Sequence, residues 1–411
     1  MELRVLPHSK DSTPAGPTAS WKDFHAVLTS IYRGDPNFIY PLQSDLEDIF
    51  SENNDAYVDG PSRIWVAYDK GKPVGRIAAF VDVKRNKDQE LQVGGLGYFE
   101  SIPNQEIADA LFDAAEDWLR EQGMQAVDGP VNFGERDKFW GLLVRGWYRP
   151  LYQESYNPPY YRAYFEQRGY RPYEQSLTLR GRLDEVPAER LERLGTSIKK
   201  RYGLSTKRIT KQNLRQSADD FAEAYNASFS HNPYFKPLTG EVVYPSFLQM
   251  KPIMDTYLTC LVYDKEEKPV ALAAFIPDIN GFMPGFKGKL NWQTVPRFLW
   301  RLKFQKQRNF KGVALGVADE YQKRGLYAVM CHELYTDGDS HVMKTYEAMD
   351  LATIRGHNDL MIASCRAIGT DIHRIHLAYR KGLVEGAEWE PFNMQPEEVV
   401  EMGDIAFWES K

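Results

Sequence analysis

The sequence predicts a mixed α/β protein built from two domains. Three observations lead to this prediction: a length of 411 residues, a charged hairpin motif that occurs once in each half, and an alternation of strand-like and helix-like segments after each copy. A chain of this length exceeds the usual size of one hydrophobic core, so two domains are expected. Alternating strands and helices are typical of α/β architectures.

The hairpin motif begins at Tyr68 in the first half and at Tyr263 in the second. Each copy reads Tyr-Asp-Lys, then Lys-Pro-Val, and Ala-Ala-Phe follows within a few residues, which indicates strand, charged turn and strand. An apolar-periodic helix and a proline-containing aromatic loop precede each copy, at residues 35–38 and 231–235. Two matches in the same order favour duplication over coincidence.

Between the copies, residues 185–201 carry Leu191, Leu194 and Ile198 at helical spacing within a strongly charged sequence. This pattern predicts a connecting surface helix. We therefore expect domains at residues 1–182 and 204–411, with a connector at 183–203. Within the first domain, the pattern predicts a strand at 95–100, a helix at 105–122 and a helix-strand unit at 160–178.

Composition restricts the location and the partners of the protein. Hydrophobic residues make up 43% and charged residues 26%, which is ordinary for a globular protein. The longest apolar stretches, at 271–277 and 313–317, are far shorter than the roughly 20 residues of a membrane-spanning helix, and residues 1–16 lack the apolar core of a secretory signal. A net charge of −6 argues against a nucleic-acid partner. We expect a cytoplasmic protein with a small-molecule or peptide partner and no membrane partner.

The three cysteines give no reason to expect a metal. Cys260, Cys331 and Cys365 are widely spaced, without a Cys-x-x-Cys pair or clustered histidines. We expect them to be buried thiols of a reducing compartment and predict no metal site.

The most informative stretch lies in the second half. An apolar run at 313–317 is followed by Ala-Asp-Glu-Tyr-Gln-Lys-Arg-Gly-Leu-Tyr at 318–327 and then by a helix-like segment. A turn of this kind directs backbone N–H groups and the positive end of the helix dipole at one point, which suits an anionic pyrophosphate. Lys323 and Arg324 add positive charge there. The alternative is a purely structural turn whose two cations are solvated.

Residues 322–326, Gln-Lys-Arg-Gly-Leu, resemble the Gln/Arg-x-x-Gly-x-Gly/Ala loop of the GNAT acetyltransferases, with Tyr327 in place of the final small residue. The resemblance spans nearly the whole chain and is closest to large bacterial tandem-GNAT proteins. It implies two GNAT-like domains, each with a mostly antiparallel central sheet flanked by helices. It further implies that acetyl-CoA or another acyl-CoA is bound in the second domain by Leu315, Gly316, Val317, Gln322, Lys323, Arg324, Gly325, Leu326, Tyr327 and Asn358.

The resemblance also implies catalytic positions. Asp350, at the start of the expected fifth strand, is a candidate base. Cys365 stands four residues before Gly369, where many members of the family have a tyrosine that protonates the leaving thiolate. A purely structural role is the alternative for both residues: Asp350 would be a carboxylate at a strand edge, and Cys365 would be a packed core thiol.

The first half resembles a GNAT unit with a degenerate cofactor loop. Its segment 157–170, Asn-Pro-Pro-Tyr-Tyr through Gly-Tyr, matches the closing helix of the family. The glycine-containing strand at 94–100 is followed by Ser101-Ile102-Pro103-Asn104, which has neither the glycine nor the cations of a pyrophosphate loop.

Two further segments carry open alternatives. The aromatic segment 140–161 either lines an acceptor cleft between the domains or packs the domains together. The basic segment with Arg297, Arg301, Lys303, Lys306 and Arg308 either contacts the ribose phosphate of CoA, meets an acidic partner or is a solvated face.

These observations predict an acyl-CoA-dependent N-acyltransferase, which transfers an acetyl or other acyl group to an amine of a small molecule or peptide, with the first domain shaping the acceptor cleft. One rival hypothesis is a non-catalytic scaffold built from two decayed GNAT units. A second is aminoacyl transfer from charged tRNA, which requires a continuous basic surface.

Overall fold

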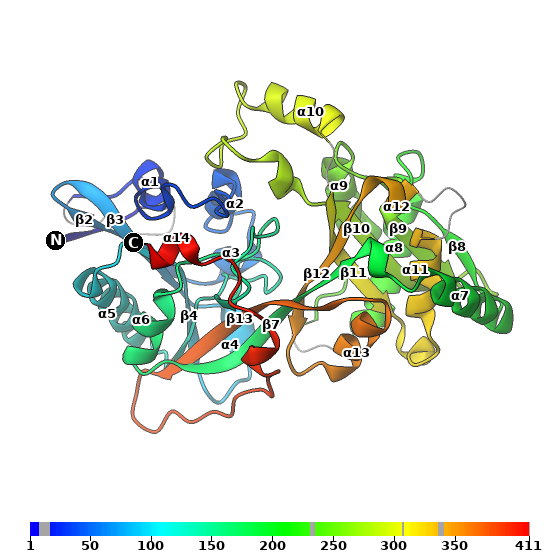
Figure 1. The fold of residues 1–411 in the computed structure, drawn as a ribbon. Coiled ribbons are helices and arrows are strands. Elements are labelled where there is room, and N and C mark those ends of the chain that lie inside the picture. Colours follow the sequence, from blue (N-terminus) through cyan, green and yellow to red (C-terminus); the bar gives the residue numbers. More distant parts are fainter. Residues whose placement is uncertain (8–16, 231–234, 306–307, 336–340, 411) are drawn as a thin grey trace.

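A computed structural model describes residues 1–7, 17–230, 235–305, 308–335 and 341–410. The expected loop at 231–235 and Lys306 of the basic segment lie wholly or mainly outside this range. The two halves of the chain lie side by side, each with strands flanked by helices (Figure 1). The mixed α/β class expected from the sequence is confirmed.

The first half runs from the N-terminus to the strand at the centre of the molecule. Its helices are α1 (Trp21–Tyr32), α2 (Gln43–Asp48), α3 (Asp55–Asp59), α4 (Val83–Asn86), α5 (Gln105–Glu121) and α6 (Tyr161–Gln167). Its strands are β1 (Glu2–Val5), β2 (Ser62–Asp69), β3 (Lys72–Phe80), β4 (Val93–Ser101), β5 (Ala126–Gly129), β6 (Leu142–Arg145) and β7 (Arg171–Arg182).

The second half repeats this order after a connecting helix. Its helices are α7 (Ala188–Tyr202), α8 (Leu214–Phe229), α9 (Gly240–Met250), α10 (Val295–Phe304), α11 (Leu326–Tyr335), α12 (His341–Thr345), α13 (Asp359–Ala367) and α14 (Ala406–Glu409). Short 3₁₀ turns are η1 (Leu183–Glu185), η2 (Thr256–Leu258), η3 (Ile279–Phe282), η4 (Asp319–Tyr321) and η5 (Glu397–Val399). Its strands are β8 (Ser205–Lys207), β9 (Thr259–Tyr263), β10 (Pro269–Pro277), β11 (Asn309–Val317), β12 (Ala348–Arg355) and β13 (Asp371–Gly382).

The strands of the described residues form one continuous sheet in the order β1-β2-β3-β4-β5-β13-β7-β12-β11-β10-β9-β8, and β6 pairs with β13 beside this path. The last strand of each half is exchanged. β7 pairs with β12 of the second half, and β13 returns to pair with β5 of the first half. β7 and β13 also pair with each other at the centre, for example Leu177 with Ile375. Neither half therefore completes its sheet alone.

The duplicated hairpins have matching registers. Tyr68 faces Pro73 in the β2–β3 hairpin, and Tyr263 faces Pro269 in the β9–β10 hairpin. Three residues past each proline, Arg76 faces Glu100 on β4, whereas Leu272 faces Gly316 on β11. Glu100 and Gly316 therefore occupy corresponding positions.

Each half contains one pair of parallel strands that diverge. β4 and β5 pair over Val93–Gly95, and β11 and β12 pair over Asn309–Lys311. In the second half no pairing continues beyond Lys311, and in the first half one further hydrogen bond, from the Val131 N–H to the Leu96 carbonyl at 2.9 Å, follows the paired residues. We call the diverging region of each strand pair a wedge. A register irregularity lies on the diverging strand in both halves, next to Tyr98 and next to Val313.

Helix α5 shows how the sequence positions the first wedge. Asn104 caps the helix by accepting a hydrogen bond from the N–H of Ile107 at 3.2 Å, which ends β4 sharply. Ile107, Leu111 and Leu119 recur at helical spacing and are buried against the sheet. Each buried leucine contributes about 1.5 to 3 kcal/mol, so the amphipathic face fixes α5 behind β4.

Candidate active site

The wedge of the second half has an open strand edge. β11 and β12 pair up to Lys311 and Asp350, and among the described residues no register pair joins Val313–Val317 to β12. Val313 is 50% exposed, and Leu315 is half-buried. An apolar strand with free backbone groups along one edge is suited to an extended ligand that pairs with it.

The loop at the end of this wedge has the form that the sequence predicts. β11 leads through η4 into Gln322–Gly325 and then into α11. Lys323 and Gly325 both adopt left-handed backbone conformations, with φ of 61° and 81°. They turn the chain so that the first N–H groups of α11, which have no acceptor within the helix, face the loop.

The two cations of the loop are exposed. The Arg324 guanidinium lies over the rings of Tyr321 and Tyr202, at 4.8 and 5.3 Å from their centroids. This stacking fixes part of the Arg324 side chain while its charge faces solvent. Gln322 donates to Asp319 at 2.8 Å, so the side chain of Gln322 is held within the loop.

Tyr327, which departs from the expected small residue, bridges two helices. Its half-buried hydroxyl donates to the sulfur of Met361 on α13 at 3.5 Å. Burial raises the pKa of Tyr327 to about 12. Cys365 lies one turn further along α13 and is 1% exposed, and burial raises its pKa to about 12 as well. Both side chains therefore stay protonated at neutral pH.

Two further predicted site residues are Asp350 and Asn358. Asp350 is buried away from solvent, and Asn358 has a structural role. Asp350 is fully buried, and its nearest cations are Arg180 at 3.5 Å and Arg374 at 4.0 Å. Burial raises the pKa of Asp350, and the two arginines act in the opposite direction. Asn358 caps α13, because its Oδ1 accepts from the N–H of Met361 at 3.1 Å.

The wedge of the first half is closed by tyrosines. The N–H of Ser101, at the end of β4, donates to the Tyr161 hydroxyl at 2.7 Å. The Tyr160 hydroxyl donates to the Ser101 carbonyl at 2.9 Å. These two side chains, at the start of α6, cover the edge of β4. The corresponding edge of β11 in the second half is open.

A pocket beside this closed edge contains the buried carboxyl group of Glu100. The Tyr32 and Tyr161 hydroxyls donate to its Oε2 at 2.9 and 2.8 Å, and Arg76 lies 3.7 Å from Oε1. Burial raises the pKa of Glu100 to about 7, although Arg76 and the two hydroxyls act in the opposite direction. A group with this pKa exchanges protons near neutral pH, which suits a general base.

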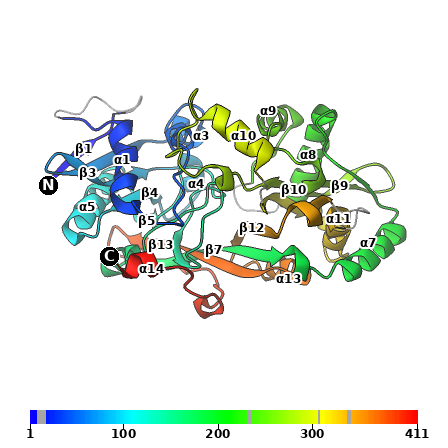
Figure 2. The ribbon, with the colours of Figure 1, turned by 45° about the horizontal axis from the view of Figure 1, so that its top comes forward.

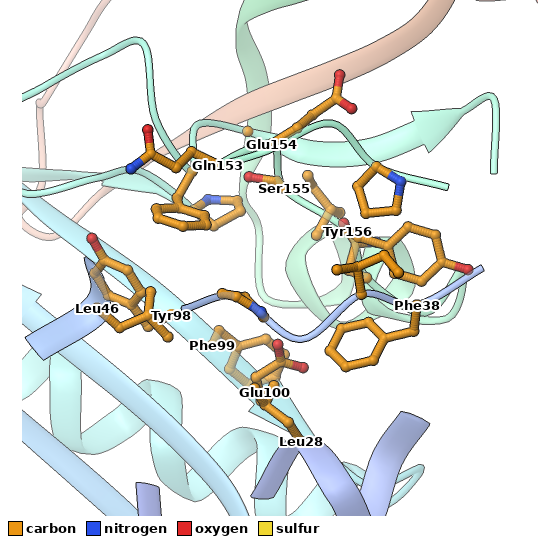
Figure 3. A pocket seen from close by; sticks show the side chains of 18 of the residues that line it. Leu28, Phe38, Leu46, Tyr98, Phe99, Glu100, Gln153, Glu154, Ser155 and Tyr156 are labelled. Carbon is orange, nitrogen blue, oxygen red and sulfur yellow. The ribbon is translucent and has the colours of Figure 1, made fainter. Parts of the chain in front are cut away.

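Apolar and aromatic side chains form most of the pocket wall. In Figure 3, Glu100 and Leu28 lie on one side, and Phe38 and Tyr156 lie together on another. The cavity volume is about 90 Å³. Tyr152, Tyr156 and Tyr161 of the aromatic segment all line it, so this segment forms a cavity wall as well as packing.

The far wall of the pocket lies at the junction of the halves. Asn280 of the second half lines it and donates to the Pro150 carbonyl at 2.9 Å. Lys311, the last residue of β11 that pairs with β12, donates to the Tyr152 carbonyl at 2.7 Å. Beside it, Arg374 lies 3.4 Å from Glu154. Burial alone would raise the pKa of the Glu154 carboxyl, but the charge of Arg374 is the largest of several effects that lower this pKa to about 2.

The two wedges are too far apart to form one site. Five strand intervals separate β4 from β11, which at about 4.8 Å each gives roughly 24 Å across the sheet. The pairing directions also make β4 and β11 run in opposite senses. The two wedges are therefore separate candidate sites, although β11 approaches the Glu100 pocket where Lys311 contacts Tyr152.

Sequence reasoning missed Glu100. It appeared only as the acidic end of a glycine-rich strand, because its partners Tyr32, Arg76 and Tyr161 are distant in sequence. Only the strand register observed in the structure aligns Glu100 with Gly316.

The described residues contain no group of three or more side chains suited to a metal ion, and no helix among them is long and apolar enough to span a bilayer.

Known proteins resemble the chain along its length. The sequence model of the Acetyltransferase (GNAT) family matches residues 23–131, which include Glu100 and the first wedge. Protein YghO of Escherichia coli is 27% identical over 88% of this chain and 92% of its own. The bacterial ceramide synthase of Caulobacter vibrioides is 24% identical over 90% of this chain and 97% of its own.

Among solved structures, a tandem GNAT protein from the clavulanic acid biosynthesis pathway matches with a TM-score of 0.52, 12% identity, and coverage of 94% of this chain and 99% of the other. At this identity the similarity concerns the fold, and it extends over both halves. The comparisons therefore place a GNAT-family domain at residues 23–131 and show that the fold of a tandem GNAT protein extends over both halves.

Proposed function

We propose that the protein is an acyl-CoA-dependent N-acyltransferase whose acyl donor binds in the wedge of the second half. The observation that carries this proposal is the open edge of β11 that leads to the loop Gln322–Leu326. The edge suits an extended pantetheine arm, and the cationic helix start suits a pyrophosphate. Leu315, Gly316 and Val317 line the arm, while Lys323 and Arg324 neutralise the phosphates.

In the proposed reaction, the amine nitrogen attacks the thioester carbon, the C–S bond breaks, and the thiolate takes up a proton while the amine loses one. Backbone N–H groups of the free β11 edge hold the oxyanion. The protonated Tyr327, half-buried near the start of α11, supplies the proton to the thiolate, whereas Cys365 is as deeply buried as Asp350 and is assigned no direct contact with the ligand. Asp350 is too deeply buried to meet the amine directly, so we assign the removal of that proton to water.

The acceptor proposed from the sequence is an amine of a small molecule or peptide. Full-length similarity to a protein named bacterial ceramide synthase supports a narrower choice, an amine that carries a long alkyl chain, together with an acyl group longer than acetyl. The reduced, buried state of all three cysteines supports the cytoplasmic location expected from the sequence.

One observation favours a different placement of the same chemistry. Glu100 has a pKa near neutrality and lines a pocket within the segment that the family model matches. If the first half catalyses the transfer, Glu100 is the general base, and Tyr160 and Tyr161 move to admit the donor.

Calorimetric titration of the intact protein with acetyl-CoA and palmitoyl-CoA separates the two placements. Lys323→Glu/Arg324→Glu reverses both loop cations, and Lys70→Glu/Lys72→Glu makes the same change at an exposed hairpin of the first half. We expect the loop variant to bind about a hundredfold more weakly and the control to bind like wild type.

Glu100→Gln completes the test. If the donor site is in the second half, this variant keeps both binding and turnover of an alkylamine. Normal binding by the loop variant, with turnover by Glu100→Gln reduced by about a hundredfold or more, would move the chemistry to the first half. No binding of either thioester by folded wild type would favour the scaffold hypothesis.

A further inference from the structure

Helix α10 and the loop before it expose an unusual density of apolar side chains. Figure 1 shows α10 at the periphery, above the junction of the halves. No residue of α10 is buried. Trp292 is 81% exposed, and Trp300 and Phe304 are each 61% exposed. Leu290, Val295 and Leu299 are also exposed, so six large apolar side chains face solvent within Leu290–Phe304, the segment we call the α10 arm.

The exposed apolar side chains of α10 lie within one half of the helix circumference, as two pairs four residues apart. Val295, Leu299, Trp300 and Phe304 follow helical spacing, and the Trp300 and Phe304 rings lie 5.7 Å apart. The opposite face fixes the helix to the protein. Arg301 donates to the Phe282 and Pro284 carbonyls at 2.8 and 2.7 Å, and its guanidinium lies 4.8 Å from the ring centroid of Phe286.

The arm is anchored to the first half. Met283 and Phe286 pack with Ile39 and Leu42 in a small hydrophobic cluster, to which Phe298 adds its ring. The N–H of Gln43 donates to the Gly288 carbonyl at 2.8 Å. The apolar outer face is therefore held outward by a fixed support and has no partner within the described chain.

The charge of this region is opposite to that of the whole protein. Residues 279–318 contain eight lysines and arginines and no aspartate or glutamate, in a chain with a net charge of −6. Lys287, Lys289, Arg297 and Lys303 are exposed, and the described residues offer them no ion pair. Lys303 lies within the apolar face itself, 5.3 Å from the Phe304 ring.

We propose that the α10 arm docks on the surface of an anionic phospholipid bilayer. Amphipathic helices with tryptophan and phenylalanine on one face and lysine and arginine around it lie in the interface between headgroups and acyl chains. A convex helix with cations at its apolar face fits a deformable anionic surface, where the lysines and arginines reach phosphates as the rings insert. The inference does not depend on the proposed acyl transfer. This proposal departs from the expectation of no membrane partner, which rested only on the lack of a segment long enough to span a membrane.

Sedimentation of the full-length protein with vesicles tests the proposal. We expect binding to phosphatidylcholine vesicles that contain phosphatidylglycerol, weaker binding to phosphatidylcholine alone, and release at high salt. Trp292→Ser/Trp300→Ser/Phe304→Ser should lower the partition coefficient by about a hundredfold. Arg297→Gln/Lys303→Gln should lower it by about twentyfold on anionic vesicles and much less on neutral ones.

Val83→Ser/Leu194→Ser/Val399→Ser is the matched control, because it removes three apolar side chains that are 46%, 42% and 52% exposed on distant elements. It should bind like wild type. The proposal is overturned if wild type does not sediment with either kind of vesicle, if anionic lipid makes no difference, or if the aromatic variant binds as well as the control. The wild-type comparison of the two vesicles decides the question even if a variant folds poorly.

Discussion

At the scale of single residues, Glu100 is a pocket carboxyl group whose pKa lies near neutrality. Its carboxyl lies among Tyr32, Tyr161 and Arg76, and its pKa is raised from 4.5 to about 7. The folded state holds the Glu100 proton more tightly than the unfolded state does. The free energy of unfolding therefore falls as pH rises from 4.5 to 7, and the loss is complete above pH 7.

Glu100→Gln should remove that pH dependence. Glutamine keeps an acceptor for the tyrosines but cannot ionise. Between about pH 4.5 and pH 8, the free energy of unfolding of wild type should fall by about 3 kcal/mol relative to the variant. Urea unfolding at both pH values measures this, with Glu90→Gln on an exposed loop as control. Parallel pH profiles for wild type and Glu100→Gln would contradict the assigned environment.

The sequence could not reveal this residue, because the groups around its carboxyl come from three other elements, α1, β3 and α6. The sequence did identify residues 322–327, because there the strand, the cations, the glycine and the helix start are contiguous. Contiguity explains why one wedge was predicted and the chemistry of the other was missed.

At the scale of elements, the stability of α13 depends on the role of Asn358. The resemblance to the family implied contact with the cofactor, whereas the structure engages Oδ1 in a helix cap. Asn358→Ala should lower the free energy of unfolding by about 1 kcal/mol, and Asn358→Asp should lower it by much less, because aspartate also caps. Thermal unfolding measures both. If both variants retain stability but lose acyl-CoA binding, Asn358 contacts the ligand instead.

The exposure of the apolar side chains of α10 could not be predicted from the sequence. From the sequence, the arginines and lysines of this helix could contact CoA, an acidic partner or solvent. The apolar side chains between them follow ordinary helical spacing, which in most helices marks a buried face. Only the structure shows that this face is exposed and that Arg301 belongs to the anchoring side.

At the scale of the whole molecule, the duplication was predictable and the strand exchange was not. The hairpins at Tyr68 and Tyr263 are visible because their turns are local. The partners of β7 and β13 depend on which sheet edge each strand meets, and the apolar pattern of a central strand is the same for either edge.

The exchange predicts that the halves depend on each other. Fragment 1–185 lacks β13, which flanks β5, and fragment 186–411 lacks β7, which flanks β12. Each fragment alone should expose unpaired edges and fail to unfold cooperatively, whereas the two expressed together should purify as a complex. Size-exclusion chromatography and thermal unfolding decide this. A fragment 1–185 that unfolds cooperatively by itself would contradict the interdependence.

The measurement that most directly tests the location of the acyl donor is amide hydrogen exchange of the intact protein with and without acyl-CoA. The proposed site predicts slower exchange at 313–317 on β11 and at 322–327, because both segments gain hydrogen bonds to the ligand. Unchanged exchange there, with protection at 98–101 on β4 and at the start of α6, would contradict the account and assign acyl-CoA to the wedge beside Glu100.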